Sequence, residues 1–203
     1  MRLFDFLPSG NGYKVRLLLT QLDIPFDWVN LNILEGETRT EAYLEKNANG
    51  RIPLLELDDG RFIAESNAIL FYLASGTPFF PTDRYLQAQV LQWMFFEQYS
   101  HEPYVAVSRF IHEFSPPGDD RFQEVPTLHK KGYAALAVMD RHLSAQDFFV
   151  GNSYTIADIA LYAYTHVAHE GGFDLAPYAN IRRWLSTVSA QEKHIEITQD
   201  SFV

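Results

Sequence analysis

The first eighty residues alternate between two kinds of hydrophobic pattern, and this alternation limits the fold more than any other feature. Apolar runs typical of strands lie at Arg2–Phe6 and Phe26–Ile33, and a hairpin with an Asp-Gly turn spans 52–64. Helical patterns separate or follow these runs, at 11–22, 41–46 and 65–75. The predicted order is therefore strand, helix, strand, helix, two strands and a helix.

That order is typical of a thioredoxin-like domain. After a stretch with two prolines, the remaining chain shows only helical periods. These predict a long helix around Leu91 that Pro103 kinks, and further helices at 127–143, 156–167 and 180–188. We therefore expect an α/β + all-α chain. Its thioredoxin-like domain would span 1–77 and its all-helical domain 84–203, with a linker at 78–83.

The charge balance excludes one class of partner. The formal net charge is −10, whereas a nucleic-acid surface needs clustered Lys and Arg. The N-terminal stretch lacks the apolar run of a signal peptide, and no stretch approaches the ~20 apolar residues of a membrane span. We expect a cytoplasmic protein that binds neither nucleic acid nor membrane.

The chain contains no cysteine, which excludes disulfides, CxxC redox chemistry and a cysteine nucleophile. His166 and His169 are spaced as neighbours on a helix, but no third ligand lies near them in the sequence. We therefore predict no metal site.

The stretch PSGNGYKVRLLL, residues 8–19, opens the first helix and carries candidate donors for a bound anion. A helix N-terminus favours negative charge, and Ser9 or Asn11 could donate a hydrogen bond to a thiolate. Gly10 and Gly12 would let a ligand approach the backbone. A plain helix cap with glycines that shape a turn is the alternative.

Two further junctions carry similar signals. If the Ile52–Pro53 bond is cis, the Ile52 backbone can pair with a peptide-like ligand; an ordinary trans proline at a strand start is the alternative. Ser66 at a helix start suits a carboxylate, and Glu65 suits an ammonium. Here too, a plain cap with a first-turn acid is the alternative.

Taken together, these stretches resemble the glutathione S-transferase superfamily over essentially the full length of the chain. SGNGYKVRLLL is similar to the first-helix motif of serine-type (zeta-like) members and of Nu-like bacterial members. NGRIPLLELDDG and ESNAILFYL are similar to the glutathione-binding half. FVGNSYTIADIALY resembles the helical domain's signature, in which Thr155 and Asp158 form a capping box. A catalytic acid is the other interpretation of Asp158, and we favour the capping box.

The resemblance implies a role for each matching residue. Glutathione would supply, as co-substrate, the thiol that the chain lacks. Ser9 would hydrogen-bond the thiolate with Asn11 as neighbour or substitute, because many serine-type members place the serine where this chain has Gly10. The remaining glutathione-binding candidates are Ile52, with Pro53, for the cysteinyl unit, Glu65 and Ser66 for the γ-glutamyl end, and Thr38, Arg39 and Arg51 for the glycine carboxylate.

The resemblance also implies an electrophile pocket between the domains. The helical side offers Trp93, Phe96, Tyr99, His101 and Tyr104, although aromatic residues at helical spacing are most often part of a core.

We therefore expect a homodimeric transferase that joins glutathione to a small electrophile, with a role in detoxification. One alternative is a glutathione-dependent isomerase or a disulfide or peroxide reductase that uses the same site. The other is a non-catalytic interaction module of the same fold.

Overall fold

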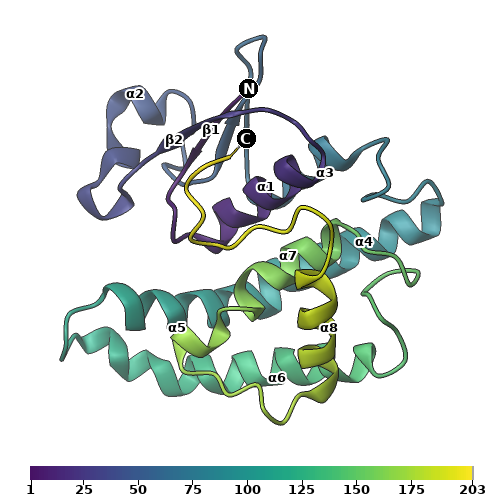
Figure 1. The fold of residues 1–203 in the computed structure, drawn as a ribbon. Coiled ribbons are helices and arrows are strands. Elements are labelled where there is room, and N and C mark those ends of the chain that lie inside the picture. Colours follow the sequence, from purple (N-terminus) through teal and green to yellow (C-terminus); the bar gives the residue numbers. More distant parts are fainter. Residues whose placement is uncertain (203) are drawn as a thin grey trace. The chain divides into compact units, whose positions relative to one another are not determined.

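The computed structural model describes residues 1–202, which form two compact units. The first unit combines Met1–Ser75 with the C-terminal stretch from Glu192 onward, and the second spans Gly76–Gln191 (Figure 1). The domain ranges 1–77 and 84–203 stay a prediction, but the grouping reveals a feature that the sequence did not suggest: the tail returns to the first unit.

The first unit is built on a four-stranded sheet in the order β2-β1-β3-β4. The strands are β1 (Arg2–Asp5), β2 (Asp27–Asn30), β3 (Leu54–Glu56) and β4 (Phe62–Ala64). β1 runs parallel to β2, and the other two pairs are antiparallel. The helices are α1 (Gly10–Gln21), α2 (Glu41–Leu44) and α3 (Ser66–Ala74), with short 3-10 turns at Ile33–Glu35 and Glu37–Arg39. This topology confirms the thioredoxin-like prediction.

The core of this unit explains why α1 and α3 pack as they do. Leu3 of β1 lies opposite Leu55 of β3, and both are completely buried. α1 buries Leu17, Leu18 and Leu19, and α3 buries Ile69 and Leu70. Both helices therefore present apolar side chains to the interior, and their first residues are held in fixed places.

The tail runs along α1 in Figure 1. The Tyr13 hydroxyl donates to the carbonyl oxygen of Ile195 at 2.8 Å and lies 3.2 Å from Nε2 of His194. Ile195 and Ile197 are buried. The tail is thus part of the first unit's core.

The second unit consists of helices, which confirms the all-α prediction for this part of the chain. They are α4 (Arg84–Phe96), α5 (Glu102–Phe114), α6 (Val125–Leu143), α7 (Ile156–Thr165) and α8 (Ala179–Ser189), with 3-10 turns at Asp120–Glu124 and Ala168–Gly171 (Figure 1). A π turn, Glu97–His101, joins α4 to α5. Pro103 lies in the first turn of α5, where a missing N–H costs least, so the helix is irregular before the proline and not at it.

Helix α7 is the centre of the second unit, since all ten of its residues are buried. Its start is fixed by the predicted capping box: Thr155 accepts from the backbone of the first turn, and the Asp158 carboxylate accepts from the Thr155 N–H at 3.0 Å. The same carboxylate accepts from the Phe149 N–H and the Trp184 indole N–H, each at 3.0 Å. Asp158 is therefore a structural hub, as the sequence predicted.

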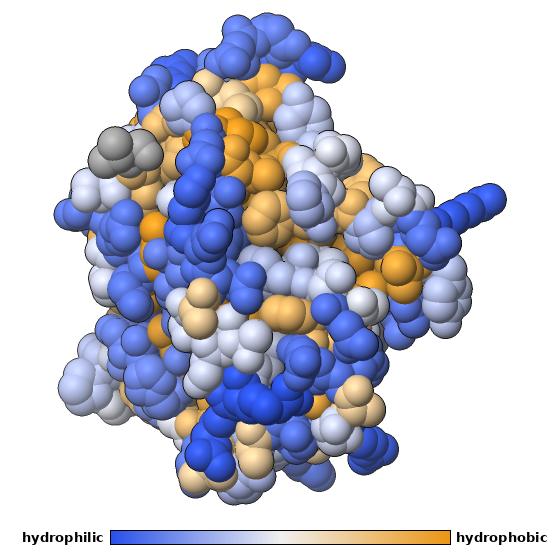
Figure 2. Space-filling model, turned by 45° about the vertical axis from the view of Figure 1, so that its right-hand side comes forward, coloured by the Kyte–Doolittle hydropathy of each residue, from blue (hydrophilic) through white to orange (hydrophobic). Residues whose placement is uncertain are grey.

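The surface is mixed in character. On the face drawn in Figure 2, hydrophilic residues surround patches of apolar ones. Among residues 1–202, no helix is both long and apolar enough to span a membrane.

The burial of Asp158 predicts a pH dependence of stability. Burial raises its pKa from 3.8 to about 6, so between these values the folded chain binds more protons than the unfolded chain. The stability that this group contributes is therefore fully present below about pH 4 and is lost as the pH rises through 6.

Chemical denaturation of the wild type and of Asp158→Asn measures this effect, because the variant lacks the titrating group. The free energy of unfolding of the wild type minus that of the variant should fall between pH 4 and pH 6 and stay level above it. A difference that rises over this interval would contradict the assignment.

Candidate functional site

The turn between β1 and α1 places Ser9 at the N-cap of α1. Its hydroxyl oxygen accepts from the Gly12 N–H at 3.3 Å, and its own N–H donates to the Phe6 carbonyl at 2.8 Å. Ser9 is therefore a helix cap, as the alternative interpretation of the sequence held. This cap leaves the hydroxyl hydrogen as a donor at the positive end of the helix dipole.

Beneath this turn lies a buried ion pair. Nε of Arg16 donates to Oδ2 of Asp5 at 2.9 Å, and both side chains are completely buried. The other carboxylate oxygen accepts from the Phe6 N–H at 2.6 Å. Burial raises the pKa of Asp5 to about 6 and lowers that of Arg16, so the carboxyl is still ionised at neutral pH.

Asn11 meets two residues that the sequence separates from it. Its amide oxygen accepts from the Lys14 ammonium at 2.7 Å and from the Ser66 hydroxyl at 3.2 Å. The Lys14 ammonium also lies 3.4 Å from the Ser66 hydroxyl oxygen. The first turns of α1 and α3 therefore share one polar cluster, in which Lys14 and Ser66 are buried.

The contact with Lys14 fixes which way the Asn11 amide faces. An ammonium can only donate, so the atom facing it must be the amide oxygen, and the amide nitrogen lies on the other side. The sequence patterns did not single out Lys14 as part of the site. Its spacing of three residues from Asn11 on one helix was the signal that could have identified it.

Glu65 has an unusual backbone. At the N-cap of α3 it adopts φ 69° and ψ 113°, a conformation that costs a side-chain-bearing residue about 1–3 kcal/mol. Such outliers persist where the surrounding structure holds them, and they gather at binding sites. Glu65 is exposed, and Ser66 behind it is buried.

The Ile52–Pro53 bond is cis, just before β3. The Arg51 carbonyl in front of it accepts from the Tyr43 hydroxyl and the Asn47 amide, each at 2.8 Å. The Arg51 side chain is exposed.

The two other candidates for the glycine carboxylate differ in exposure. Arg39 is exposed, and its guanidinium donates to the Asn49 carbonyl at 3.1 Å, whereas Thr38 is buried. None of these contacts tests the roles that the resemblance implies.

In the second unit, the aromatic candidates have different environments. Trp93 is buried, and its ring packs against His142 and Phe149. His101 is buried with Nε2 3.0 Å from the Thr165 hydroxyl. Phe96 and Tyr104 are half-buried, and Tyr99 is 83% exposed. The role of all five in an electrophile pocket stays a prediction.

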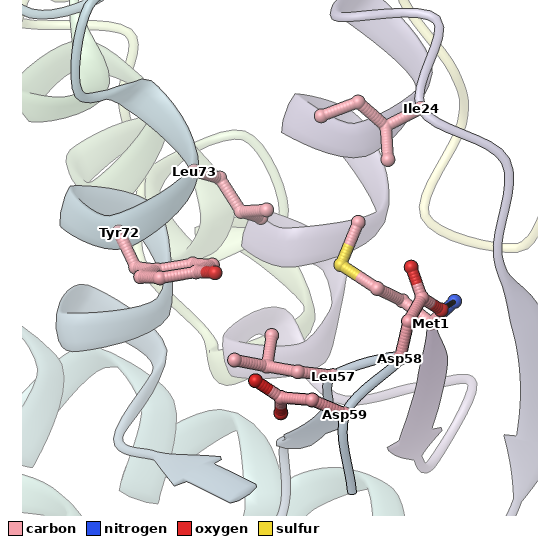
Figure 3. Close-up of a pocket in the computed structure, with 7 residues that line it drawn as sticks. All are labelled: Met1, Ile24, Leu57, Asp58, Asp59, Tyr72 and Leu73. Carbon is pink, nitrogen blue, oxygen red and sulfur yellow. Dashed lines mark hydrogen bonds and ion pairs between the residues drawn. The ribbon is translucent and has the colours of Figure 1, made fainter. Parts of the chain in front are cut away.

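A hollow of about 420 Å³ lies elsewhere in the first unit (Figure 3). It is lined by Met1, Ile24, Leu57, Asp58, Asp59, Tyr72 and Leu73. None of these is a predicted site residue. Of its two acidic side chains, Asp58 pairs with the N-terminal ammonium of Met1. Within residues 1–202, no cluster of three or more His, Cys, Asp or Glu side chains could hold a metal ion.

Family models match both units of the chain. The model described as "Glutathione S-transferase, N-terminal domain" matches residues 1–75, and "Glutathione S-transferase, C-terminal domain" matches residues 91–192. This chain belongs to the glutathione S-transferase family. The resemblance stated from the sequence motifs is confirmed.

Solved glutathione S-transferase structures agree with the family models. One from Pseudomonas fluorescens Pf-5 is 51% identical, covers 98% of both chains and has a TM-score of 0.95. A possible glutathione S-transferase from Rhodopseudomonas palustris is 44% identical, with the same coverage and TM-score.

Two curated relatives are more distant. "Glutathione S-transferase D7" of Drosophila melanogaster is 26% identical over 90% of this chain and 81% of its own length. "Protein URE2" of Candida albicans is 25% identical, and this chain spans only 64% of that longer protein.

The tight fit of Gly12 over Asp5 gives a prediction. A Cβ at Gly12 would lie 1.5 Å from a carboxylate oxygen of Asp5, so Gly12→Ala must displace a buried charge. We expect it to cost about 3 kcal/mol or more of the free energy of unfolding. Gly60→Ala is the control: Gly60 has φ 83° but open space around it, so the cost should be about 1–2 kcal/mol. Equal losses in thermal or chemical unfolding would contradict the packing described here.

Proposed function

We propose that this chain is a glutathione transferase that binds glutathione on its first unit, promotes ionisation of the thiol and presents the thiolate to a small electrophile. The observation that carries the proposal is the contact between Asn11 and Ser66. It brings the N-terminal turns of α1 and α3 together, and both turns favour an anion. The thiolate and a carboxylate of one ligand can therefore each bind at the N-terminus of a helix.

Two side chains are proposed to stabilise the thiolate. The hydroxyl oxygen of Ser9 accepts from the Gly12 N–H, and the hydroxyl hydrogen of Ser9 would donate to the sulfur. The oxygen of Asn11 is held by Lys14 and Ser66, so its amide nitrogen is the end that donates to the sulfur. Each bond favours the charged form of the thiol and so lowers its pKa.

The rest of the tripeptide is assigned by charge and position. Ser66 would bind the γ-glutamyl carboxylate through the backbone N–H groups at the start of α3, since its hydroxyl donates to Asn11, and Glu65 would bind the ammonium. The Ile52 backbone, beside Pro53, would pair with the cysteinyl unit. Arg39, Arg51 and Thr38 stay proposals for the glycine carboxylate.

The acceptor is proposed to be a small electrophile that contacts the aromatic side chains of α4 and the residues after it. The role in detoxification stays a prediction that rests on the family, and the cytoplasmic location stays a prediction that rests on the sequence patterns.

Removing the Glu65 carboxylate tests where glutathione binds. Glu65→Ala should weaken glutathione binding by about 1.5–3 kcal/mol, the value of a hydrogen bond to a charged group. It should leave the thiol pKa of bound glutathione unchanged, because Glu65 does not serve the sulfur. Calorimetric titration measures the affinity, and Glu45→Ala, at an exposed position on the end of α2, is the control. Normal affinity in Glu65→Ala would place the γ-glutamyl end elsewhere.

Deleting the thiolate donors tests the chemistry. Ser9→Ala and Asn11→Ala should each raise the thiol pKa of bound glutathione by roughly one unit, since one unit corresponds to ~1.4 kcal/mol. Thiolate absorbance, titrated against pH with glutathione at saturation, gives the value. If neither variant shifts it, the backbone N–H groups of α1 are the stabilising donors. A wild type that is not retained on glutathione resin at all would favour the non-catalytic module over the transferase.

We also propose a homodimer. Large apolar side chains are exposed on α3, where Phe71 is 43% and Tyr72 is 47% exposed, and on α4, where Phe95 is 69% exposed. Sedimentation equilibrium should therefore give a mass about twice 23.4 kDa at micromolar concentration. A mass equal to that of one chain would contradict it.

A further inference from the structure

Arg16 lies at the centre of the first unit and has acceptors on two sides. The side chain is completely buried. Its guanidinium donates to Oδ2 of Asp5 at 2.9 Å and to the carbonyl oxygens of Leu7 at 2.6 Å, Ile197 at 3.0 Å and Gln199 at 3.2 Å. One planar side chain therefore joins parts of the chain that lie more than 180 residues apart.

Two of these acceptors, Asp5 and Leu7, come shortly before Ser9 in the chain. Asp5 ends β1, and its second oxygen accepts from the Phe6 N–H. Leu7 lies in the turn itself, and the Ser9 N–H donates back to the Phe6 carbonyl. Asp5 therefore holds the turn at the Phe6 N–H, and Arg16 holds it at the Leu7 carbonyl oxygen.

The other two acceptors belong to the tail, residues 192–202, which follows α1 in Figure 1. Ile197 is buried there. The Phe202 ring lies 5.8 Å from the Arg16 guanidinium carbon and 5.1 Å from the Phe26 ring. The tail therefore supplies two backbone oxygens to the Arg16 guanidinium.

We propose that Arg16 is a positioning residue that ties the turn bearing Ser9 to the C-terminal tail, so that a seated tail is required for full activation of the glutathione thiol. This inference rests on the proposed function. If the tail separates, two N–H groups of a buried guanidinium lose their acceptors, which is costly. The guanidinium then moves toward water and releases Leu7 and Asp5, so Ser9 loses its fixed position.

Three variants test this proposal. Arg16→Lys keeps the charge but lacks the planar fork that can bond turn and tail together. Ile197→Ala loosens the tail without altering any group of the turn. Tyr13→Phe is the matched control: it removes the hydroxyl that contacts the tail at His194 and Ile195, from the same helix, but leaves the Arg16 bonds to Ile197 and Gln199 in place.

The measurement is the thiol pKa of bound glutathione, from thiolate absorbance, together with the glutathione dissociation constant. Arg16→Lys should raise the pKa by roughly one unit and Ile197→Ala by a smaller amount, with no shift in Tyr13→Phe. The double variant of Arg16→Lys and Ile197→Ala should shift it no further than Arg16→Lys alone, since both act through one contact. Measured below the thiol pKa of bound glutathione, where the thiol is protonated in every variant, the dissociation constant should change less than about threefold, because the γ-glutamyl contacts are untouched.

An unchanged pKa in folded Arg16→Lys would overturn the inference, and so would an equal shift in Tyr13→Phe, which would indicate general loosening. If Arg16→Lys does not fold, Ile197→Ala decides alone: a raised pKa supports the inference, and an unchanged pKa overturns it. The wild type separates this inference from the function it rests on. A wild type that fails to lower the thiol pKa overturns both, whereas a normal wild type with unchanged variants overturns only the role of Arg16.

Discussion

The buried ion pair between Asp5 and Arg16 is the interaction on which the geometry of the first unit depends. Removing two charges from water is costly, and only good geometry and further hydrogen bonds offset that cost. Asp5 meets this condition by accepting from the Phe6 N–H, and Arg16 by donating to backbone carbonyls on two sides. Loss of either partner would leave an uncompensated charge, at a cost of about 3–5 kcal/mol. Strand β1, the turn after it and helix α1 are therefore held together.

The candidate site follows from that arrangement. Once the start of α1 is fixed, Asn11 can meet Ser66 at the start of α3, and Lys14 orients the Asn11 amide. Under the proposed function, the chain needs no cysteine of its own for thiol chemistry, because glutathione would supply the thiol. In the second unit, the capping box of Thr155 and Asp158 fixes the start of buried helix α7. The two buried carboxylates therefore differ in role: Asp5 holds the turn of the candidate site, whereas Asp158 stabilises the helical fold.

Much of the fold could be predicted from local patterns. Strands and helices alternate with clear hydrophobic periods, and the Thr155–Asp158 spacing predicts a capping box, because both depend on neighbours in sequence. Other features depend on tertiary packing. The contact of Lys14 with Ser66 spans 52 residues, and that of Arg16 with the tail spans more than 180. No periodicity predicts that a basic side chain will be buried, so Arg16 and Lys14 escaped notice, while Ser9 and Asn11 stood out because they lie at a helix start.

A crystal structure of the chain with bound glutathione tests the central claim most directly, because it locates every part of the ligand at once. The account predicts that the sulfur lies within hydrogen-bonding distance of the Ser9 hydroxyl or the Asn11 amide nitrogen, with the γ-glutamyl end at Glu65 and Ser66. A sulfur bound away from the start of α1, or a γ-glutamyl end away from the start of α3, would contradict it.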